Sequence, residues 1–217
     1  MPHAVIFDID GVLVDSYRAH FESWRRLAAE RGLEVTEAMF AACFGRTSRD
    51  IIRGWWGDAV GDAEARALDE RKEALYRDIV RADFPAMDGA VELIESLHAG
   101  GFKLAVGSSG PPANVDLVLA KLNRDGRFSA KVTGEDVTRG KPDPQVFLVA
   151  AKRLGVPPGS CAVVEDAKAG VAAANAAGMA SIGLTGTTDR AGLAHAKLVV
   201  ASLRELTAER IKRLLAS

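Results

Sequence analysis

Two aspartates separated by one isoleucine follow an unbroken apolar run near the start of the chain. The run is AVIF at positions 4–7, and the acids are Asp8 and Asp10. An uninterrupted apolar run is typical of a strand buried on both faces, and burying charge beside such a strand is costly. The two carboxylates therefore either reach solvent at a turn or meet a positive charge.

Two other predicted strands, FKLAVGSS at 102–109 and CAVVED at 161–166, also end in polar residues. These residues are Ser108 and Ser109, followed by Gly110, in the first case and Glu165 and Asp166 in the second. Lys141 lies in the loop GKPDP, just before a predicted helix. Because the carboxyl ends of parallel strands meet at one edge of a sheet, we expect these groups to gather there.

Four clustered carboxylates repel one another unless a cation binds among them. A ligand set made only of oxygen, without His or Cys, points to Mg²⁺ rather than zinc. The backbone amides at the start of the helix predicted at 111–122, the Ser108 hydroxyl and the Lys141 ammonium are suited to binding a phosphate. Carboxylates, Mg²⁺ and an anion site together predict phosphoryl transfer.

Within such a site, the two acids of the D-x-D pattern can take different roles. One carboxylate can attack phosphorus, while the other protonates the leaving oxygen and later activates water. Residues two apart on an extended strand project to the same side, so Asp8 and Asp10 are expected to face one substrate. Attack by an anion on a phosphate requires a metal and a lysine to offset the charge.

The elements that position these residues alternate between strand and helix in most of the chain. Strands are predicted at 4–7, 102–109, 129–134, 161–166 and 180–184, and helices at 16–31, 90–101, 111–122, 144–155, 167–179 and 202–215. This alternation predicts an α/β fold with a mostly parallel, Rossmann-like sheet and helices on both faces.

The stretch 33–84 departs from this alternation. It is rich in helix formers and charges and contains no convincing strand, so it predicts an all-helical unit inserted after the first strand. Gly32 is expected to end the helix before it. At its far end, Pro85 breaks the last helix and Asp88 is expected to cap the next one.

The composition of the chain indicates which kinds of binding partner are not expected. The chain has 217 residues, of which 48% are hydrophobic and 26% charged, with a formal net charge of −1, so neither nucleic acid nor a membrane is expected as a partner. Cys43 and Cys161 lack the spacing of a zinc site or a disulfide framework, and no segment is long and apolar enough to span a membrane. A cytoplasmic protein is expected; the oligomeric state stays open, and a monomer is compatible with the sequence.

Four motifs, in order along nearly the whole chain, resemble those of the haloacid dehalogenase superfamily. They are DIDGVLVDS, the strand ending in Ser108, Lys141 in GKPDP, and VVEDAKAG. The chain is identified as a member of the branch that includes β-phosphoglucomutases and small sugar-phosphate phosphatases. The resemblance implies a catalytic core of residues 1–14 and 85–217 and a helical cap domain of residues 15–84, which closes over the site and selects the substrate.

The resemblance also implies roles for individual residues. Asp8 is the nucleophile and Asp10 the general acid and base, while Ser108 and Lys141 hold the phosphoryl group with Ser109 and Gly110 beside them. Mg²⁺ is bound by Asp8, the Asp10 backbone carbonyl and Asp166, with Glu165 helping directly or through water.

Three cap residues are candidates for binding the substrate. They are His20, which in similar mutases assists proton transfer, and Arg46 and Arg49, which could clamp a second phosphate or a sugar. Phe44 departs from the mutase pattern, in which this position tends to be Lys. Trp55 and Trp56 are expected to pack within the cap rather than to stack on substrate.

Each motif alone also has an ordinary structural interpretation. Asp10-Gly11 is a turn signal, and Lys141 by itself would be an exposed loop lysine. Asp166 and Ser109 each precede a predicted helix and could cap it. Capping is compatible with a functional role, because a ligand at a helix start can serve both purposes.

The sequence therefore predicts a Mg²⁺-dependent phosphatase that acts on a small phosphorylated metabolite, such as a sugar phosphate, through an aspartyl-phosphate. The first alternative is a β-phosphoglucomutase-like mutase that uses the same intermediate. A dehalogenase of the same fold is disfavoured by Asp10, since those enzymes need no Mg²⁺ and lack this second aspartate. A catalytically silent module that binds a phosphorylated ligand is the most distant alternative.

Overall fold

The chain divides into two compact units. The computed structural model describes residues 2–57, 59–122 and 125–216. Residues 1–15 and 86–217 form the first unit, here called the sheet unit, and residues 16–85 form the second, here called the helical unit. The predicted boundaries, after residues 14 and 84, each lie one residue earlier than these.

The described part of the sheet unit contains one six-stranded parallel sheet. Its order is β3-β2-β1-β4-β5-β6, with every neighbouring pair parallel. The strands are β1 (Ala4–Phe7), β2 (Lys103–Gly107), β3 (Phe128–Val132), β4 (Cys161–Glu165), β5 (Ala180–Leu184) and β6 (Leu198–Val200). This is the strand order of a Rossmann-type fold, in which ligands bind outside the carboxyl ends of the strands where the order reverses. Here the order reverses between β1 and β4.

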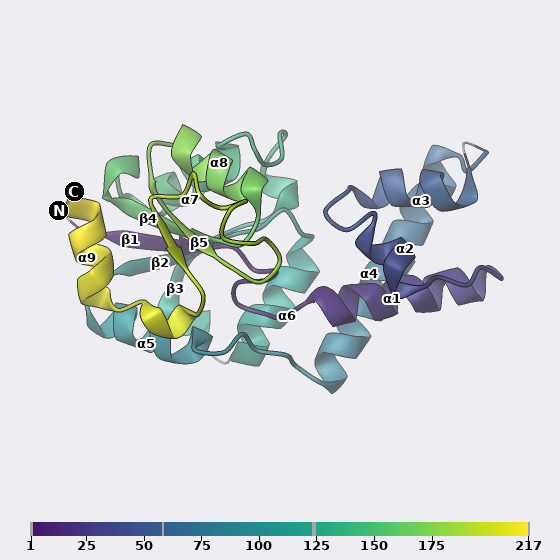
Figure 1. The fold of residues 1–217 in the computed structure, drawn as a ribbon, viewed down its shortest axis with the longest axis horizontal. Helices are drawn as coiled ribbons and strands as arrows, with labels where there is room; N and C mark the ends of the chain where they lie inside the picture. The colour runs from purple at the N-terminus through teal and green to yellow at the C-terminus, as the bar shows by residue number, and fades with distance from the viewer. Residues whose placement is uncertain (1, 58, 123–124, 217) are drawn as a thin grey trace. The chain divides into compact units, whose positions relative to one another are not determined.

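Helices cover both faces of the sheet (Figure 1). They are α5 (Ala90–Ala99), α6 (Pro112–Leu122), α7 (Gln145–Leu154), α8 (Lys168–Ala176) and α9 (Ala208–Ala216). In this view α7 and α8 lie above the sheet, while α5 and α9 lie on its other side. The predicted α/β class is therefore confirmed.

The packing explains why the central strands contain only apolar residues. All four residues of β1 are buried, because both of its faces are covered. On one face, Ile6 of β1 and Val163 of β4 belong to the same apolar cluster as Phe147 of α7 and Ala173 of α8. Ala173 and Ala174 of α8 both belong to this cluster, as expected for a helix packed closely on a sheet.

Three details of the sheet unit differ from expectation. The strand β6 was not predicted, because three residues are too short to show a period. The closing helix begins at Ala208 rather than 202, since Ser202 caps a separate short turn before it. Asp88 does not cap α5: the N-cap is Gly89, and Asp88 accepts hydrogen bonds from Arg204 at 2.8 and 2.7 Å.

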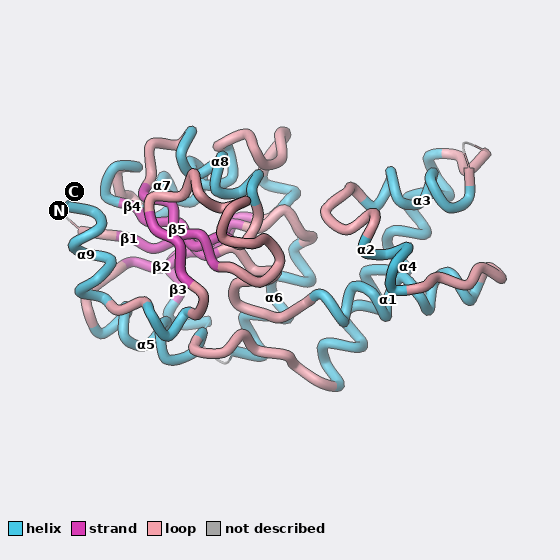
Figure 2. The backbone as a smooth tube through the Cα atoms, viewed as in Figure 1, coloured by secondary structure: helices cyan, strands magenta, loops and turns pink. Residues whose placement is uncertain are grey.

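The helical unit contains no strand among its described residues, as predicted (Figure 2). Its helices are α1 (Tyr17–Glu30), α2 (Glu37–Ala41), α3 (Ser48–Trp56) and α4 (Asp62–Ala82). Gly32, with φ +72°, follows the end of α1 as expected, and the Thr36 and Thr47 hydroxyls cap α2 and α3.

An apolar cluster that includes Trp24, Leu27, Phe40 and Ile52 forms the core of the helical unit. Both Trp55 and Trp56 pack against it, and their rings meet edge to face at 5.9 Å. Throughout the described residues, every helix is too short or too polar to cross a membrane.

Candidate active site

The carboxyl ends of three adjacent strands bring the predicted site residues together. Phe7 of β1 lies opposite Val106 of β2 on one side and Val164 of β4 on the other. The residues that follow therefore emerge at one edge of the sheet. The Asp8 amide continues the pairing by donating to the Val164 carbonyl at 3.0 Å.

Lys141 connects two of these carboxylates. Its Nζ donates to Asp8 Oδ1 at 2.7 Å and to Glu165 Oε1 at 2.5 Å, and it also lies 5.1 Å from the centroid of the Phe147 ring. The Lys141 side chain is only 11% exposed, so the interpretation as an exposed loop lysine is wrong. An ammonium buried between two carboxylates is a strong, directional ion pair.

The residues at this edge fit a divalent cation. Asp8, Glu165 and Asp166 are all buried, and each offers a carboxylate oxygen within 4.8 Å of the others. One lysine cannot neutralise three buried carboxylates, and an all-oxygen donor set is the kind that Mg²⁺ prefers. A divalent cation at this cluster would balance the charge.

The pKa values of these groups reflect the excess of negative charge. Burial and, after it, the neighbouring Glu165 carboxylate raise the pKa of Asp166 to about 7. Burial also raises the pKa of Asp8 well above its usual value, against the opposing effect of Lys141. Burial lowers the pKa of Lys141, but the carboxylates of Asp8 and Glu165 more than reverse this, so the ammonium stays charged.

These pKa values predict how pH and metal removal affect stability. An unfolded chain ionises Asp166 near pH 4, whereas the folded, metal-free protein keeps that proton until about pH 7. The folded state binds more protons in this interval, so its free energy of unfolding in EDTA should fall as pH rises, by up to about 1.4 kcal/mol per pH unit for each such group.

Protons and Mg²⁺ compete for the same oxygens, so the stabilisation by Mg²⁺ should grow over the same pH range. Melting temperatures in EDTA and in about 10 mM Mg²⁺, measured from about pH 5.5 to about pH 8, check both trends. A difference between the two melting temperatures that does not change with pH would contradict the assignment of a metal to this cluster.

The backbone at Asp10 differs from the extended strand that was expected. The strand β1 ends at Phe7, so the chain around Asp10 is a turn rather than an extended strand. Its backbone bridges to Val14, and the Gly11 amide donates to the Val14 carbonyl at 2.8 Å. Asp10 is still close enough that its charge contributes to the raised pKa values of Asp8 and Asp166, after burial and the nearer groups.

The loop after β2 lies at the same edge of the sheet. Ser108 is buried, and its Oγ accepts a hydrogen bond from the Gly110 amide at 3.0 Å, whereas Ser109 is exposed. The Gly134 amide donates to the Gly110 carbonyl at 2.9 Å. A side chain at Gly134 would lie 2.5 Å from the Ser109 carbonyl oxygen, so this close backbone approach requires glycine.

Glu165, rather than Asp166, accepts the backbone hydrogen bonds at the start of α8. Glu165 Oε2 accepts from the amides of Asp166 at 3.0 Å and Ala167 at 3.1 Å, while Oε1 binds Lys141. No side-chain cap comes from Ala167, the N-cap residue. Glu165 is fully buried and bound through both oxygens, so its position is fixed.

Gly170 in α8 provides the space for Glu165, and sequence reasoning did not single it out. A Cβ at Gly170 would lie 1.9 Å from Glu165 Cδ and Oε1. The signal was present in EDAKAG, where a glycine lies five residues after the glutamate. Spacing alone cannot tell such a packing requirement from an ordinary helix glycine.

Gly170→Ala is expected to destabilise the protein, although alanine normally favours a helix by about 1 kcal/mol over glycine. The added methyl group collides with a glutamate that cannot move, so the free energy of unfolding should fall by about 2–3 kcal/mol. Urea unfolding measures this change in the free energy of unfolding. Gly54→Ala in α3 is the matched control, because a Cβ there meets nothing within 4 Å. Equal stability of the Gly170→Ala variant and the wild type would contradict this account.

His20 is half-buried and belongs to a polar cluster of the helical unit. Its ring stacks on Tyr76 with centroids 4.3 Å apart, and its Nδ1 lies 2.9 Å from Lys72 Nζ. An ammonium only donates, so Nδ1 is the acceptor in this contact. Lys72 also donates to Glu73 at 2.7 Å and is only 3% exposed. Sequence reasoning missed Lys72, which resembled a surface residue of a charged helix.

The other candidate residues of the helical unit are on its surface. Arg46 and Arg49 are exposed, and Arg49 donates to Asp62 at 2.8 Å. Phe44 packs edge to face against Tyr17 and Phe40, with ring centroids 5.0 and 5.3 Å apart. Phe44 therefore contributes to the packing of this unit.

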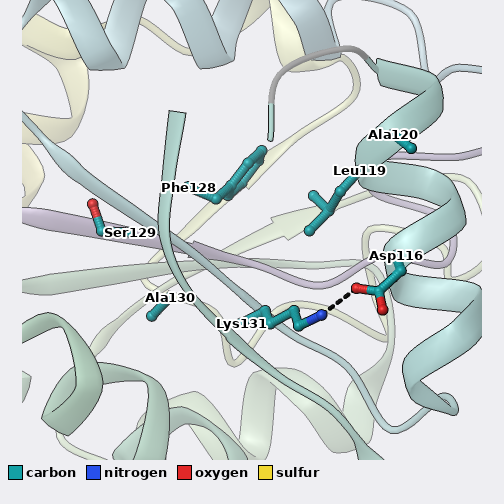
Figure 3. A pocket seen from close by; sticks show the side chains of 7 residues that line it. All are labelled: Asp116, Leu119, Ala120, Phe128, Ser129, Ala130 and Lys131. Atoms are coloured by element: carbon teal, nitrogen blue, oxygen red, sulfur yellow. Dashed lines mark hydrogen bonds and ion pairs between the residues drawn. The ribbon is translucent and has the colours of Figure 1, made fainter. Parts of the chain in front are cut away.

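A pocket of about 470 Å³ lies elsewhere on the sheet unit, between α6 and β3 (Figure 3). Lys131 of β3 reaches Asp116 of α6 across it, and the Phe128 ring and Leu119 provide apolar walls. None of the predicted phosphate or metal residues lines this pocket. The chemistry therefore concentrates at the carboxyl ends of the strands and not in this groove.

Comparisons with known proteins give a consistent result. The sequence model of the haloacid dehalogenase-like hydrolases matches residues 2–178. The validoxylamine A 7'-phosphate phosphatase of Streptomyces hygroscopicus subsp. limoneus is 32% identical over 209 residues, covering 95% of this chain and 96% of that protein. A phosphorylated carbohydrates phosphatase of Thermotoga maritima is 33% identical over 184 residues, covering 82% and 83%.

A solved structure has the same fold as this chain. The crystal structure of β-phosphoglucomutase from Clostridium difficile superposes with a TM-score of 0.86 at 27% identity, covering 100% of this chain and 98% of that one.

Proposed function

Because this chain belongs to the haloacid dehalogenase-like hydrolases, as its four motifs predicted, we propose that it is a Mg²⁺-dependent phosphatase of a small phosphorylated metabolite, most simply a sugar phosphate. The observation that carries the proposal is the buried Lys141 ammonium between Asp8 and Glu165, beside Asp166. Two relatives are named as phosphatases, one of them for phosphorylated carbohydrates.

The proposed reaction has two displacements at phosphorus. A carboxylate oxygen of Asp8 attacks the phosphoryl group, and the ester oxygen leaves with a proton from Asp10. Asp10, now ionised, takes a proton from a water molecule, which attacks the aspartyl-phosphate. The phosphorus–Asp8 bond breaks, inorganic phosphate leaves, and both side chains return to their initial states.

Lys141 and Ser108 hold the phosphoryl oxygens during both displacements, with Ser109 and Gly110 beside them. Glu165 orients Lys141 through the 2.5 Å hydrogen bond described above. The residues proposed to hold Mg²⁺ are Asp8, the Asp10 backbone carbonyl, Glu165 and Asp166. When bound, Mg²⁺ supplies positive charge that offsets the carboxylates and the transferring phosphoryl group.

Phe44 favours a phosphatase over a mutase. A mutase must hold a second phosphate while its intermediate turns around, and related mutases tend to carry Lys at this position. In this chain the aromatic ring is packed between Tyr17 and Phe40, so the position cannot supply a cation. The mutase nevertheless remains the second candidate, because a β-phosphoglucomutase structure superposes on the whole chain.

The helical unit is proposed to act as the cap that selects the substrate, with His20, Arg46 and Arg49 as its contacts. The two free cysteines, Cys43 and Cys161, are compatible with a cytoplasmic location, where thiols stay reduced.

A panel of phosphorylated metabolites, assayed for phosphate release with Mg²⁺ and with EDTA, tests the proposal. We expect Mg²⁺-dependent release from one or more sugar phosphates. Incubation with β-glucose 1-phosphate and a bisphosphate activator separates the two candidates, because a mutase gives an isomerised sugar phosphate and a phosphatase gives free phosphate. An isomerised product without phosphate release would replace the first candidate with the second.

A further inference from the structure

A fourth loop reaches the candidate active site from the carboxyl end of β5. In the pairing of β4 with β5, Glu165 lies opposite Gly183, so the chain that follows β5 passes beside Asp166. Thr187 lies in this loop, and its hydroxyl faces the Asp166 carboxylate closely enough to lower the pKa of that carboxyl. This contact adds a residue that none of the four motifs contains.

The backbone at Gly11 also lies close to the Asp166 carboxylate. A Cβ at Gly11 would lie 2.0 Å from Asp166 Oδ2 and 3.0 Å from Thr187 Oγ1. The backbone at Gly11, with φ +70°, and the Thr187 hydroxyl are therefore both in close contact with the same carboxylate. Asp166 is only 5% exposed, so these neighbours restrict how its carboxylate can rotate.

The loop holds Thr187 by backbone contacts on both sides. The Thr185 amide donates to the Val200 carbonyl of β6 at 2.9 Å, and the Gly186 amide donates to the Thr188 carbonyl at 3.3 Å. Further along, the Gly192 amide donates to Asp189 Oδ1 at 2.8 Å. Because threonine is branched at Cβ, its hydroxyl has few alternative positions once this backbone is fixed.

We propose that Thr187 is a positioning residue for Asp166, aiming its carboxylate toward the Mg²⁺ site that the proposed function requires. Without the Thr187 hydroxyl beside it, Asp166 would turn away from the neighbouring carboxylates of Asp8 and Glu165, because like charges repel. Residues that hydrogen-bond a metal ligand from behind typically contribute about 10–100-fold to metal affinity.

Isothermal titration with MgCl₂ tests this inference on three variants of the full chain. Thr187→Val removes the hydroxyl but keeps the shape, and its Mg²⁺ dissociation constant should rise about tenfold. Thr187→Ser keeps the hydroxyl and should stay within about threefold of the wild type. Thr188→Val is the control, since its threonine is the next residue of the same loop. Melting in EDTA should be unchanged in all three.

The possible failures are distinguishable. A wild-type affinity for Mg²⁺ in Thr187→Val would overturn this inference alone, and phosphate release would still support the proposed function. Equal losses in Thr187→Val and Thr187→Ser would also overturn it, because they would assign Thr187 a role in packing. Failure of the wild-type chain to bind Mg²⁺ would overturn the proposed metal site and this inference with it.

Discussion

Asp8→Asn is expected to reduce the turnover of a generic aryl phosphate by about 10⁴-fold or more, because an amide cannot attack phosphorus. The substitution keeps the shape of the side chain, and the Asn carbonyl oxygen can still accept the hydrogen bond that Lys141 makes at 2.7 Å. The fold should therefore survive while chemistry stops. Phosphate release with saturating Mg²⁺ measures the effect, and circular dichroism checks the fold.

Asp10→Asn should also abolish turnover, by removing the group that passes protons. Asp116→Asn on α6 is the matched control, since this aspartate pairs with Lys131 outside the candidate active site and its loss should leave activity within about twofold. Retained activity in Asp8→Asn would refute the aspartyl-phosphate mechanism. A beryllofluoride or vanadate adduct on Asp8 in the wild type would argue against a silent binding module.

Lys141→Met should affect both activity and stability. The substitution removes the buried ammonium that pairs with Asp8 and Glu165 and leaves these carboxylates, beside Asp166, without it. Loss of a group that stabilises phosphoryl charge should lower kcat/KM about a thousandfold. Removing one partner of a buried ion pair should lower the free energy of unfolding in EDTA by about 3–5 kcal/mol at pH 8.

Part of this stability should return at lower pH, because the carboxyls then take up protons and need no counter-charge. Urea unfolding at pH 8 and pH 5 measures the change. Lys131→Met is the control, since the Lys131 side chain is 46% exposed and surface ion pairs contribute about 0–1 kcal/mol. A Lys141→Met variant with a tenth or more of wild-type kcat/KM would exclude Lys141 from the reaction.

The sequence was most informative where local chemistry and strand periodicity agree. The apolar run before Asp8 predicted β1, and the polar residues that end CAVVED and FKLAVGSS predicted an edge where functional groups meet. The ion pair of Lys141 with Asp8 joins residues 133 positions apart, and the sequence predicted only that Lys141, in the loop GKPDP, would gather at the same edge as the aspartates. In any parallel sheet, the residues that end adjacent strands lie at the same edge of the sheet.

Contacts that depend on packing in three dimensions could not be predicted in this way. Gly170 looks like any helix glycine until Glu165 is placed beside it, and Lys72 looks like a surface lysine until His20 and Tyr76 surround it. Thr187 was within reach, because TGTTD follows a predicted strand. The residues that follow the predicted strands at 129–134 and 180–184 were not among the predicted site residues.

The bridge between Val14 and Ala86 gives the protein a modular architecture. These two residues flank the helical unit and pair with each other, and the Met87 amide donates to the Leu13 carbonyl at 3.1 Å. The insertion thus leaves and re-enters the sheet unit at neighbouring points, so its length imposes no strain on β1. Because the helical unit is proposed to select the substrate, exchanging it at this point for a helical module of another sequence is expected to change the specificity and to leave the reaction of the sheet unit unchanged.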